Sequence, residues 1–481
     1  MTRPTIAMVL CMLALAPLPA AARLAGPPVV VKKSQVRDLA AIRSSKVLRV
    51  LVNQSRNSSG EVQGQSVGVE YHRLRAFEEY LNGHARDGQR LTLKIIPKAK
   101  DQLLGALQRG EGDLVAPGEL LDSSNAQGVD ASVPVVSHVP LIVVGIKGEH
   151  AFKHVEQLSG KTLTLAMGSA ADDAVHQVNQ KLALRKLPLI KIEWVDPSLA
   201  VEDVLEMIQG GIYHLTVVEQ PIAERWAKIM PKLRVDRGLV LSNSGDMNWY
   251  VRRDATMLRA SVDSFLQTYQ APSNQDLSLE QAYGTSYQVH YPLAREDRQR
   301  LEQLRPVLQR NADEQGMDWL ALAALAFKES KLDPDVRGGG GATGLLQITP
   351  SAAQRVGVGN IQNLDGNVQA GAKYLALIRR KFFNSTKVNE RERMAFVLAA
   401  YNLGPERVAG MRAEAKKRGL NPNQWFFQVE RIAMEQAGMG VVSYVNSVNK
   451  YYLAFDHERE ALETQPAQVK KQKAVSRKKS M

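Results

Sequence analysis

The chain has 481 residues and a mass of 53.1 kDa, and this length predicts two or three domains rather than one core. Its 44% hydrophobic and 23% charged residues exclude wholesale disorder and a collagen-like fibre. The net charge of +13 and the pI near 9.6 favour anionic partners, which include nucleic acid, a cell-wall polymer and a membrane surface.

The first residues have the pattern of a secretory signal. Arg3 supplies a positive charge, residues 6–18 form a short apolar stretch, and the alanines at 20–22 form a cleavage site, so we predict a signal peptide at 1–22. The apolar stretch is shorter than the roughly 20 residues that span a membrane. Cys11, the single cysteine, follows a leucine, which is unlike a lipoprotein signal. We expect a periplasmic protein, and peripheral association with the outer membrane stays open.

Strand-like and helical patterns alternate over residues 36–285. The expected strands cover 47–52, 91–96, 140–145, 162–166, 190–195, 215–219, 238–242 and 249–252, and the expected helices include 71–81, 102–107 and 201–209. This alternation is typical of an α/β domain with a mostly parallel sheet. The last two expected strands, 238–242 and 249–252, are expected to return to the first group of elements, which contains the strands at 47–52 and 91–96.

The order of these elements resembles the solute-binding domain of the amino-acid-receptor type, in which two α/β lobes close on a ligand. The motifs are Gly112-Asp113-Leu114 and Gly168-Ser169, the second of which also fits an ordinary turn and helix cap. Asn125 stands where such domains usually carry an arginine that pairs with a ligand carboxylate. The ligand is therefore left open among a peptide, a sugar and a wall fragment, or the domain is a scaffold only.

Helical patterns follow one another from 296 to 455. Residues 458–481 then lose hydrophobic periodicity and end in a run of lysines and arginines, which predicts a solvated, disordered tail. The chain thus divides into a predicted signal peptide, an α/β domain at 36–285, an all-α domain at 296–455 and a basic tail.

A glutamate interrupts the apolar face of one strong helix, residues 318–332. Leu322, Leu325 and Ala326 precede Glu329 by seven, four and three positions, so Glu329 lies on the apolar stripe. Burial beside aliphatic side chains raises the pKa of a carboxyl group, which lets it act as a general acid near neutral pH. The alternative is a glutamate at the edge of the stripe that reaches water.

Polar residues also interrupt two later apolar segments. Gln347 follows a glycine-rich stretch at 338–344, and its amide is either a satisfied core group or a donor that faces a substrate. Tyr401 and Asn402 stand at the C-terminal edge of another apolar helix.

These residues resemble the soluble-lytic-transglycosylase domain, which has a helical lysozyme-like fold. The matching motifs, in order, are Glu329-Ser330, the stretch 344–350, Asn367-Val368 and Ala400-Tyr401-Asn402. The resemblance implies that Glu329 is catalytic, that Ser330, Gln347, Tyr401 and Asn402 hold the sugar or orient Glu329, and that Tyr444 closes the cleft. Relatives commonly carry a glutamate where this chain has Gly440.

With the solute-binding module in front, the whole chain resembles the membrane-bound lytic murein transglycosylase F family. The resemblance implies cleavage of the β-1,4 bond between MurNAc and GlcNAc in peptidoglycan, with a 1,6-anhydro-MurNAc end as product and Glu329 as the single acid and base. Asp333 and Asp335 lie past the helix end and are weak candidates for a second carboxylate. The alternatives are a lysozyme-type hydrolase and a periplasmic solute or peptide receptor with a glycan-binding C-terminal domain.

Metal and cofactor sites lack support in the sequence. Nine histidines are scattered without ligand spacing, and neither a phosphate-binding loop nor a dinucleotide motif is present. We therefore expect no cofactor and no metal. Net charge alone favours nucleic acid, and peptidoglycan suits a periplasmic protein better, so we expect glycan strands as the partner, with a small ligand or muropeptide in the front domain.

Overall fold

The computed structural model describes residues 37–58, 61–62, 65–83, 85–86, 88–121, 126–242 and 245–463. The predicted signal peptide and Asn125 lie outside these residues, as do residues 464–481 of the predicted tail. No helix in the described part of the chain combines the length and the apolar character needed to cross a membrane.

The beginning of the predicted tail is helical, which corrects the expectation of disorder from residue 458. Helix α17 covers Arg459–Glu463. Arg459 pairs with Asp456 at 2.7 Å and with Glu463 at 3.0 Å, and it also meets Asp318. Leu462 is buried at 1% exposure, so side-chain contacts to the helical domain hold this turn in place.

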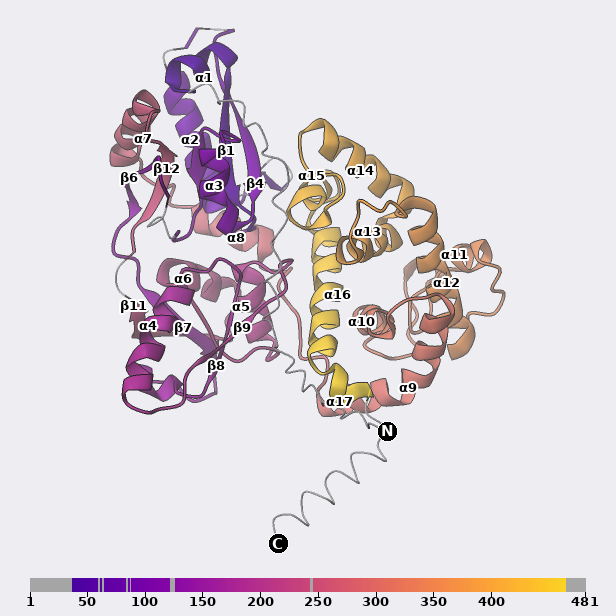
Figure 1. The fold of residues 1–481 in the computed structure, drawn as a ribbon. Coiled ribbons are helices and arrows are strands. Elements are labelled where there is room, and N and C mark those ends of the chain that lie inside the picture. The colour runs from indigo at the N-terminus through magenta and orange to yellow at the C-terminus, as the bar shows by residue number, and fades with distance from the viewer. Residues whose placement is uncertain are drawn as a thin grey trace, which may run out of the picture. The chain divides into compact units, whose positions relative to one another are not determined.

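The first lobe is built on a five-stranded sheet in the order β4-β1-β5-β12-β6 (Figure 1). Strand β1 runs parallel to β4 and β5, whereas β12 runs antiparallel to β5 and β6. A short pair, β2 and β3, is separate from this sheet. The strand bounds are β1 Val47–Asn53, β2 Glu61–Val62, β3 Gln65–Ser66, β4 Thr92–Lys98, β5 Leu114–Ala116, β6 Val129–Val136 and β12 Met247–Arg252.

Helices cover this sheet through buried aromatic rings. Phe77 on α2 lies 5.5 Å from Trp249 on β12, and Phe265 on α7 lies 6.0 Å from the same ring, measured between centroids. The helices of the lobe are α1 Leu39–Ser45, α2 Val69–Asn82, the 3-10 turn η1 Lys100–Gln102, α3 Leu103–Gln108 and α7 Thr256–Thr268.

The second lobe has a three-stranded sheet in the order β10-β7-β11, and both pairings of β7 are antiparallel. Strands β8 and β9 form a parallel pair. The prediction of a mostly parallel sheet is thus wrong for this lobe, because strand and helix alternation does not specify direction. The elements are β7 Leu141–Ile146, η2 Val155–Leu158, β8 Thr162–Leu165, α4 Ala171–Leu184, β9 Lys191–Trp194, α5 Val201–Gln209, β10 Thr216–Glu219, α6 Gln220–Ile229, β11 Leu233–Ser242 and α8 Gln275–Tyr283.

The C-terminal domain is helical, and the apolar helix α10 packs against α9 and α16 in its core. Asp318 caps α10 by accepting a hydrogen bond from the backbone of Leu320, and Thr349 caps α11 in the same way. The helices are α9 Arg295–Glu314, α10 Trp319–Ser330, η3 Gly339–Gly341, α11 Pro350–Arg355, α12 Leu364–Phe382, α13 Glu390–Leu403, α14 Pro405–Lys417, the irregular turn η4 Trp425–Val429, α15 Glu430–Ala437 and α16 Met439–His457.

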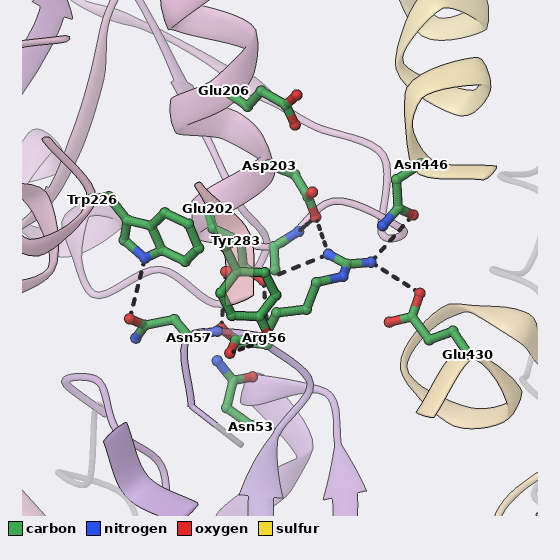
Figure 2. A network of polar contacts seen from close by, with 12 residues as sticks. Asn53, Arg56, Asn57, Glu202, Asp203, Glu206, Trp226, Tyr283, Glu430 and Asn446 are labelled. Carbon is green, nitrogen blue, oxygen red and sulfur yellow. Dashed lines mark hydrogen bonds and ion pairs between the residues drawn. The ribbon is translucent and has the colours of Figure 1, made fainter. Parts of the chain in front are cut away.

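A buried network of charged side chains links α5 to the helical domain (Figure 2). Arg56 donates to Asp203 at 2.7 Å and to Glu430 at 3.1 Å. Lys450 on α16 lies 2.7 Å from the second oxygen of Asp203 and also pairs with Glu206. We call this set the Arg56 cluster, and its members are Arg56, Glu202, Asp203, Glu206, Glu430 and Lys450, each at most 3% exposed.

The Arg56 cluster contains four carboxyl groups and two cations. Glu202 accepts hydrogen bonds from the backbone of Arg56 at 2.7 Å and from Ser55 at 2.9 Å. Burial, followed by repulsion from Asp203, nevertheless raises the pKa of Glu202 to about 7. Burial acts to raise the pKa of Asp203 as well, but Arg56 and Lys450 outweigh it and lower that pKa. A proton on Glu202 would relieve part of the excess negative charge of the cluster.

Candidate active site

Glu329 stands in the last turn of α10. The helix ends at the next residue, Ser330, because Lys331 and Leu332 adopt left-handed backbone angles, with φ of 56° and 61°. The side chain of Glu329 is half-buried. Glu329 therefore lies on the apolar face of α10 at a point where that face is partly accessible to solvent.

Burial raises the pKa of Glu329 above its ordinary value, against a hydrogen bond from Tyr444 and the nearby charge of Lys328, which both act to lower it. Among the described residues, no carboxylate contributes to this shift. Asp333 and Asp335 are exposed, and the backbone of Asp335 donates to Asp333 at 2.9 Å. Glu329 is thus a single carboxyl group that tends to hold its proton.

Tyr444 on α16 donates its hydroxyl to Glu329 Oε1. The ring is 7% exposed. Burial and the neighbouring Glu329 raise the pKa of Tyr444 well above its ordinary value, so the phenol stays protonated and keeps donating. The structure therefore brings Glu329 and Tyr444 into direct contact.

Ser330 turns away from the open side of Glu329. Its hydroxyl lies 3.0 Å from the carbonyl oxygen of Ala326 and 2.9 Å from that of Leu345, and the residue is buried. This geometry fastens α10 to the loop at residues 336–349. Of the two predicted roles, it fits orientation of the site rather than contact with sugar.

Gln347 also holds that loop. Its backbone is left-handed, with φ of 47°, and its Nε2 donates to Val336 O at 3.1 Å and to Gly344 O at 2.9 Å. A Cβ added at Gly338 would lie 2.1 Å from Gln347 Oε1, so any larger residue there would displace the end of the Gln347 side chain. The amide nitrogen of Gln347 is thus bound to backbone carbonyl oxygens.

Tyr401 lies against the same loop from the side of α13. Its hydroxyl donates to Leu346 O at 2.7 Å, and its ring is 5.8 Å from that of Tyr374. Burial, together with the charge of Glu329, raises the pKa of Tyr401 well above its ordinary value. Asn402 follows it on α13 and is exposed to solvent. Tyr401 therefore belongs to the surroundings of Glu329, and Asn402 faces outward.

Asn367 is a residue that the sequence motifs contained but to which no role was assigned. Its Oδ1 accepts from Leu346 N at 2.9 Å, and its Nδ2 donates to Thr343 O at 2.8 Å. A Cβ at Gly344 would lie 2.4 Å from Asn367 Nδ2. Its signal in the sequence was a polar side chain on the apolar face of a helix, as for Glu329. Asn367 fixes the loop from α12.

The α/β domain has its own candidate ligand site. A cavity of about 590 Å³ is lined by both lobes and by residues of the helical domain that include Phe427 and Gln428. Lys100 Nζ lies in its wall, 2.9 Å from Glu119 and 3.6 Å from Glu219. Burial alone would lower the pKa of Lys100, but the two carboxylates raise it. This cavity therefore holds a lysine that keeps its charge.

The predicted anion site at Gly168-Ser169 is a local helix start. The backbone of Ala171, the first residue of α4, donates to Ser169 Oγ at 3.2 Å. Ser169 also lines the cavity. The turn before α4 fits the ordinary reading of the motif, and contact of Ser169 with a ligand in the cavity stays a prediction.

Residues 306–424 match the transglycosylase SLT domain family. A membrane-bound lytic murein transglycosylase F from Desulfosudis oleivorans is 25% identical over 403 residues, which cover 82% of this chain and 83% of that protein. The protein of the same name from Pseudomonas fluorescens is 26% identical over 433 residues, which cover 86% and 85%.

Solved structures match the α/β domain. An ancestral arginine-binding protein bound to arginine has a TM-score of 0.39 at 19% identity and covers 50% of this chain and 98% of its own. An amino acid ABC transporter substrate-binding protein from Streptococcus pneumoniae bound to L-arginine has a TM-score of 0.39 at 18% identity and covers 52% and 96%. With the relatives spanning both domains and the SLT match enclosing Glu329, Gln347 and Tyr401, this chain is a homologue of membrane-bound lytic murein transglycosylase F that carries a transglycosylase SLT domain.

Proposed function

We propose that the chain is a lytic transglycosylase that cleaves the β-1,4 bond between MurNAc and GlcNAc in peptidoglycan, with Glu329 as its catalytic residue. The observation that carries this proposal is the half-buried carboxyl group of Glu329, whose pKa is raised and which accepts a hydrogen bond from Tyr444. Relatives that cover 82% and 86% of the chain bear the name of this activity.

In the first step Glu329 acts as a general acid. The protonated carboxyl group donates its proton to the glycosidic oxygen, and the bond between that oxygen and C1 of MurNAc breaks. The GlcNAc side leaves with a hydroxyl group, and positive charge develops at C1. The raised pKa of Glu329 favours this step because it keeps more of the carboxyl group protonated near neutral pH.

In the second step the same residue acts as a base. The carboxylate of Glu329 accepts the proton of the C6 hydroxyl of MurNAc, and O6 bonds to C1 to close the 1,6-anhydro ring. The substrate supplies the nucleophile, so no water enters and no second carboxylate is needed. Glu329 ends the cycle protonated, as it began.

Tyr444 is a positioning residue in this mechanism. Its hydrogen bond to Oε1 leaves Oε2 to carry the proton that moves, and it stabilises the carboxylate that forms after the first step. Ser330, Gln347, Tyr401 and Asn367 hold the loop beside Glu329 through backbone hydrogen bonds. Asn402 is the exposed candidate for direct contact with sugar.

The cavity of the α/β domain supports binding of a small ligand, for which a muropeptide is our candidate. The name of the relatives supports a location at a membrane of the cell envelope, and the predicted signal peptide favours its periplasmic side. A peripheral position at the outer membrane is part of the same proposal.

Mass spectrometry of muropeptides released from purified peptidoglycan tests the activity. The expected products are lighter by one water than hydrolytic products, and Glu329→Gln is expected to release none while its circular dichroism stays unchanged. Hydrated reducing ends would instead indicate a lysozyme-type hydrolase. Binding of glycan without any release would indicate a receptor.

A further inference from the structure

Three leucines are exposed close together on the second lobe. Leu184 is 86% exposed, Leu187 36% and Leu189 48%, and they lie within six positions at the end of α4 and the turn that follows. Single exposed leucines are ordinary, but a cluster marks a contact surface. We call residues 181–191 the leucine segment.

The leucine segment is held firmly by the lobe. Leu182 and Ile190 near its ends are buried at 1% and 3% exposure. Asn179 brackets Ile190, because its Nδ2 donates to Ile190 O at 2.9 Å and its Oδ1 accepts from Ile190 N at 2.8 Å. The backbone of Leu187 donates to Leu182 O at 3.0 Å. The three leucines are therefore presented by an ordered turn.

Cations surround these leucines. Lys181, Arg185, Lys186 and Lys191 belong to the segment and are exposed, and the segment contains no acidic residue. Lys161 is exposed beside it, since its carbonyl oxygen accepts from Lys191 N at 2.9 Å. The neighbouring acid with a direct pairing is Glu156, which lies 2.7 Å from Arg185. The charge around the leucines is therefore strongly positive.

We infer that the leucine segment docks on an anionic lipid surface. The leucines enter the boundary between headgroups and acyl chains, while the lysines and Arg185 meet the headgroup phosphates. The relatives are named membrane-bound, and no described helix is long and apolar enough to span a membrane, so a peripheral contact of this kind suits the chain. The inference concerns attachment and is independent of the proposed lytic activity.

The chemistry favours lipid over glycan at this surface. A polysaccharide strand offers hydroxyl and amide groups, which gain little from exposed leucines. An anionic bilayer offers an apolar layer that can accept the leucines and a layer of negative charge that can bind the lysines and Arg185.

Vesicle sedimentation with the chain from Arg23 onward tests the leucines. On vesicles of phosphatidylethanolamine and phosphatidylglycerol, we expect the triple variant Leu184→Ser, Leu187→Ser, Leu189→Ser to have a partition constant lower by about ten-fold or more. Leu277→Ser is the matched control for Leu184→Ser, because Leu277 is 51% exposed on α8, away from the segment. The control is expected to bind as the wild type.

Replacing the anionic lipid by phosphatidylcholine, or raising the salt concentration, tests the cations. Both changes are expected to weaken binding, and Arg185→Ser with Lys186→Ser is expected to reduce the salt dependence. The basic residues of the predicted tail are the same in every variant, so differences among variants report on the segment.

A fluorescent label gives a local reading. The chain from Arg23 onward contains no cysteine, so Ala183→Cys provides a single attachment point on an exposed residue of the segment. A label at 183 is expected to shift to the blue when vesicles are added, and the same label in Leu277→Cys is expected to stay unchanged.

Unchanged vesicle binding by the triple variant would overturn the inference, as would a label at 183 that does not respond to vesicles. A wild type that dimerises in solution, with a monomeric triple variant and equal vesicle binding, would assign the segment to contact between copies and would also overturn it. A circular dichroism spectrum and a thermal melt of the triple variant that match the wild type confirm that the variant is folded.

Discussion

The carboxyl group of Glu329 and those of the Arg56 cluster are both buried, yet they have different partners. Burial raises the pKa of Glu329 and likewise that of Glu202, Glu206 and Glu430. Glu329 is half-buried and accepts a hydrogen bond from a neutral phenol. The carboxyl groups of the cluster are at most 3% exposed and share two cations, Arg56 and Lys450.

The difference teaches that a raised pKa alone does not identify a catalytic group. In the Arg56 cluster the surplus of acid over base is contained inside the protein, where no substrate reaches it. Glu329 is only half-buried, a neutral phenol donates to it, and no cation in the described part of the chain forms an ion pair with its carboxyl group. A candidate catalytic acid therefore needs, in addition to burial, exposure to solvent on one side and a neutral hydrogen-bond partner.

The largest expected effect is on catalysis. Glu329→Gln removes the proton donor, and we expect the rate of muropeptide release to fall by about 10³-fold or more. The unfolding midpoint is expected to stay unchanged, because glutamine has nearly the same shape as glutamate and can still accept the hydrogen bond from Tyr444. A release assay and a thermal melt check both statements, and a variant that still releases product at the wild-type rate would reject the assignment.

Arg56→Ala is expected to act on stability. The change leaves Glu430 buried without its cation and Asp203 with Lys450 alone, and we expect a loss of about 3 to 5 kcal/mol in the free energy of unfolding. Arg109→Ala is the matched control, because Arg109 pairs with Glu111 at an exposed position and is expected to cost less than about 1 kcal/mol. Urea unfolding measures both, and equal losses would mean that the cluster is not held by its charges.

Tyr444→Phe separates positioning from folding. Loss of the hydrogen bond to Glu329 is expected to slow release by about ten- to a hundred-fold. That hydrogen bond lowers the pKa of Glu329, so its removal raises this pKa further, and activity is expected to persist to higher pH before the general acid loses its proton. A pH profile of the initial rate tests this sign, and a shift toward lower pH would contradict it.

The pKa of Glu202 predicts a pH dependence of stability. Its pKa is raised from the ordinary 4.5 to about 7 in the folded chain, so the folded state binds a proton more tightly than the unfolded state. The resulting contribution to stability is complete below pH 4.5 and is lost as pH rises to about 7. Glu202→Gln is expected to flatten this slope in urea unfolding between those pH values, with a change of the order of 1 kcal/mol for each pKa unit.

The smallest effect is expected at Asn402. Asn402→Ala is expected to leave stability within about 0.5 kcal/mol, since the residue is exposed, and to slow release by about three- to ten-fold if it contacts the sugar. Steady-state kinetics on soluble glycan fragments measure the change. A rate equal to the wild type would assign the sugar contact to another residue.

Much of the helical domain was predictable because its signals are local. The apolar stripe indicated where Glu329 stands, and the structure places Glu329 in the last turn of the helix that was expected at 318–332. Ser330, Gln347 and Tyr401 were predicted near the site, and the structure adds that their polar groups bind backbone carbonyls of one loop. Which carbonyl oxygen each polar group binds depends on the geometry of the loop, and the hydrophobic periodicity of the sequence does not describe that geometry.

Long-range pairings were not predictable in the same way. Arg56 and Glu430 are 374 positions apart, and no local sequence pattern distinguishes either residue from the other charged residues around it. The antiparallel pairings of β7 and the helix at Arg459–Glu463 depend likewise on contacts with distant residues. Strand direction and pairing are properties of the folded chain that a hydrophobic pattern leaves undetermined.

The position of β12 has a consequence for the order in which the chain is assembled. Strand β6 joins the first sheet only through β12, whose residues 247–252 come more than a hundred positions after β6. A chain that emerges from its N-terminus can pair every strand of the second lobe, residues 141–242, before β6 has a neighbour. When the chain folds from its N-terminus, the first lobe is therefore expected to be completed last of the two, and until then its open sheet edge can pair with other chains.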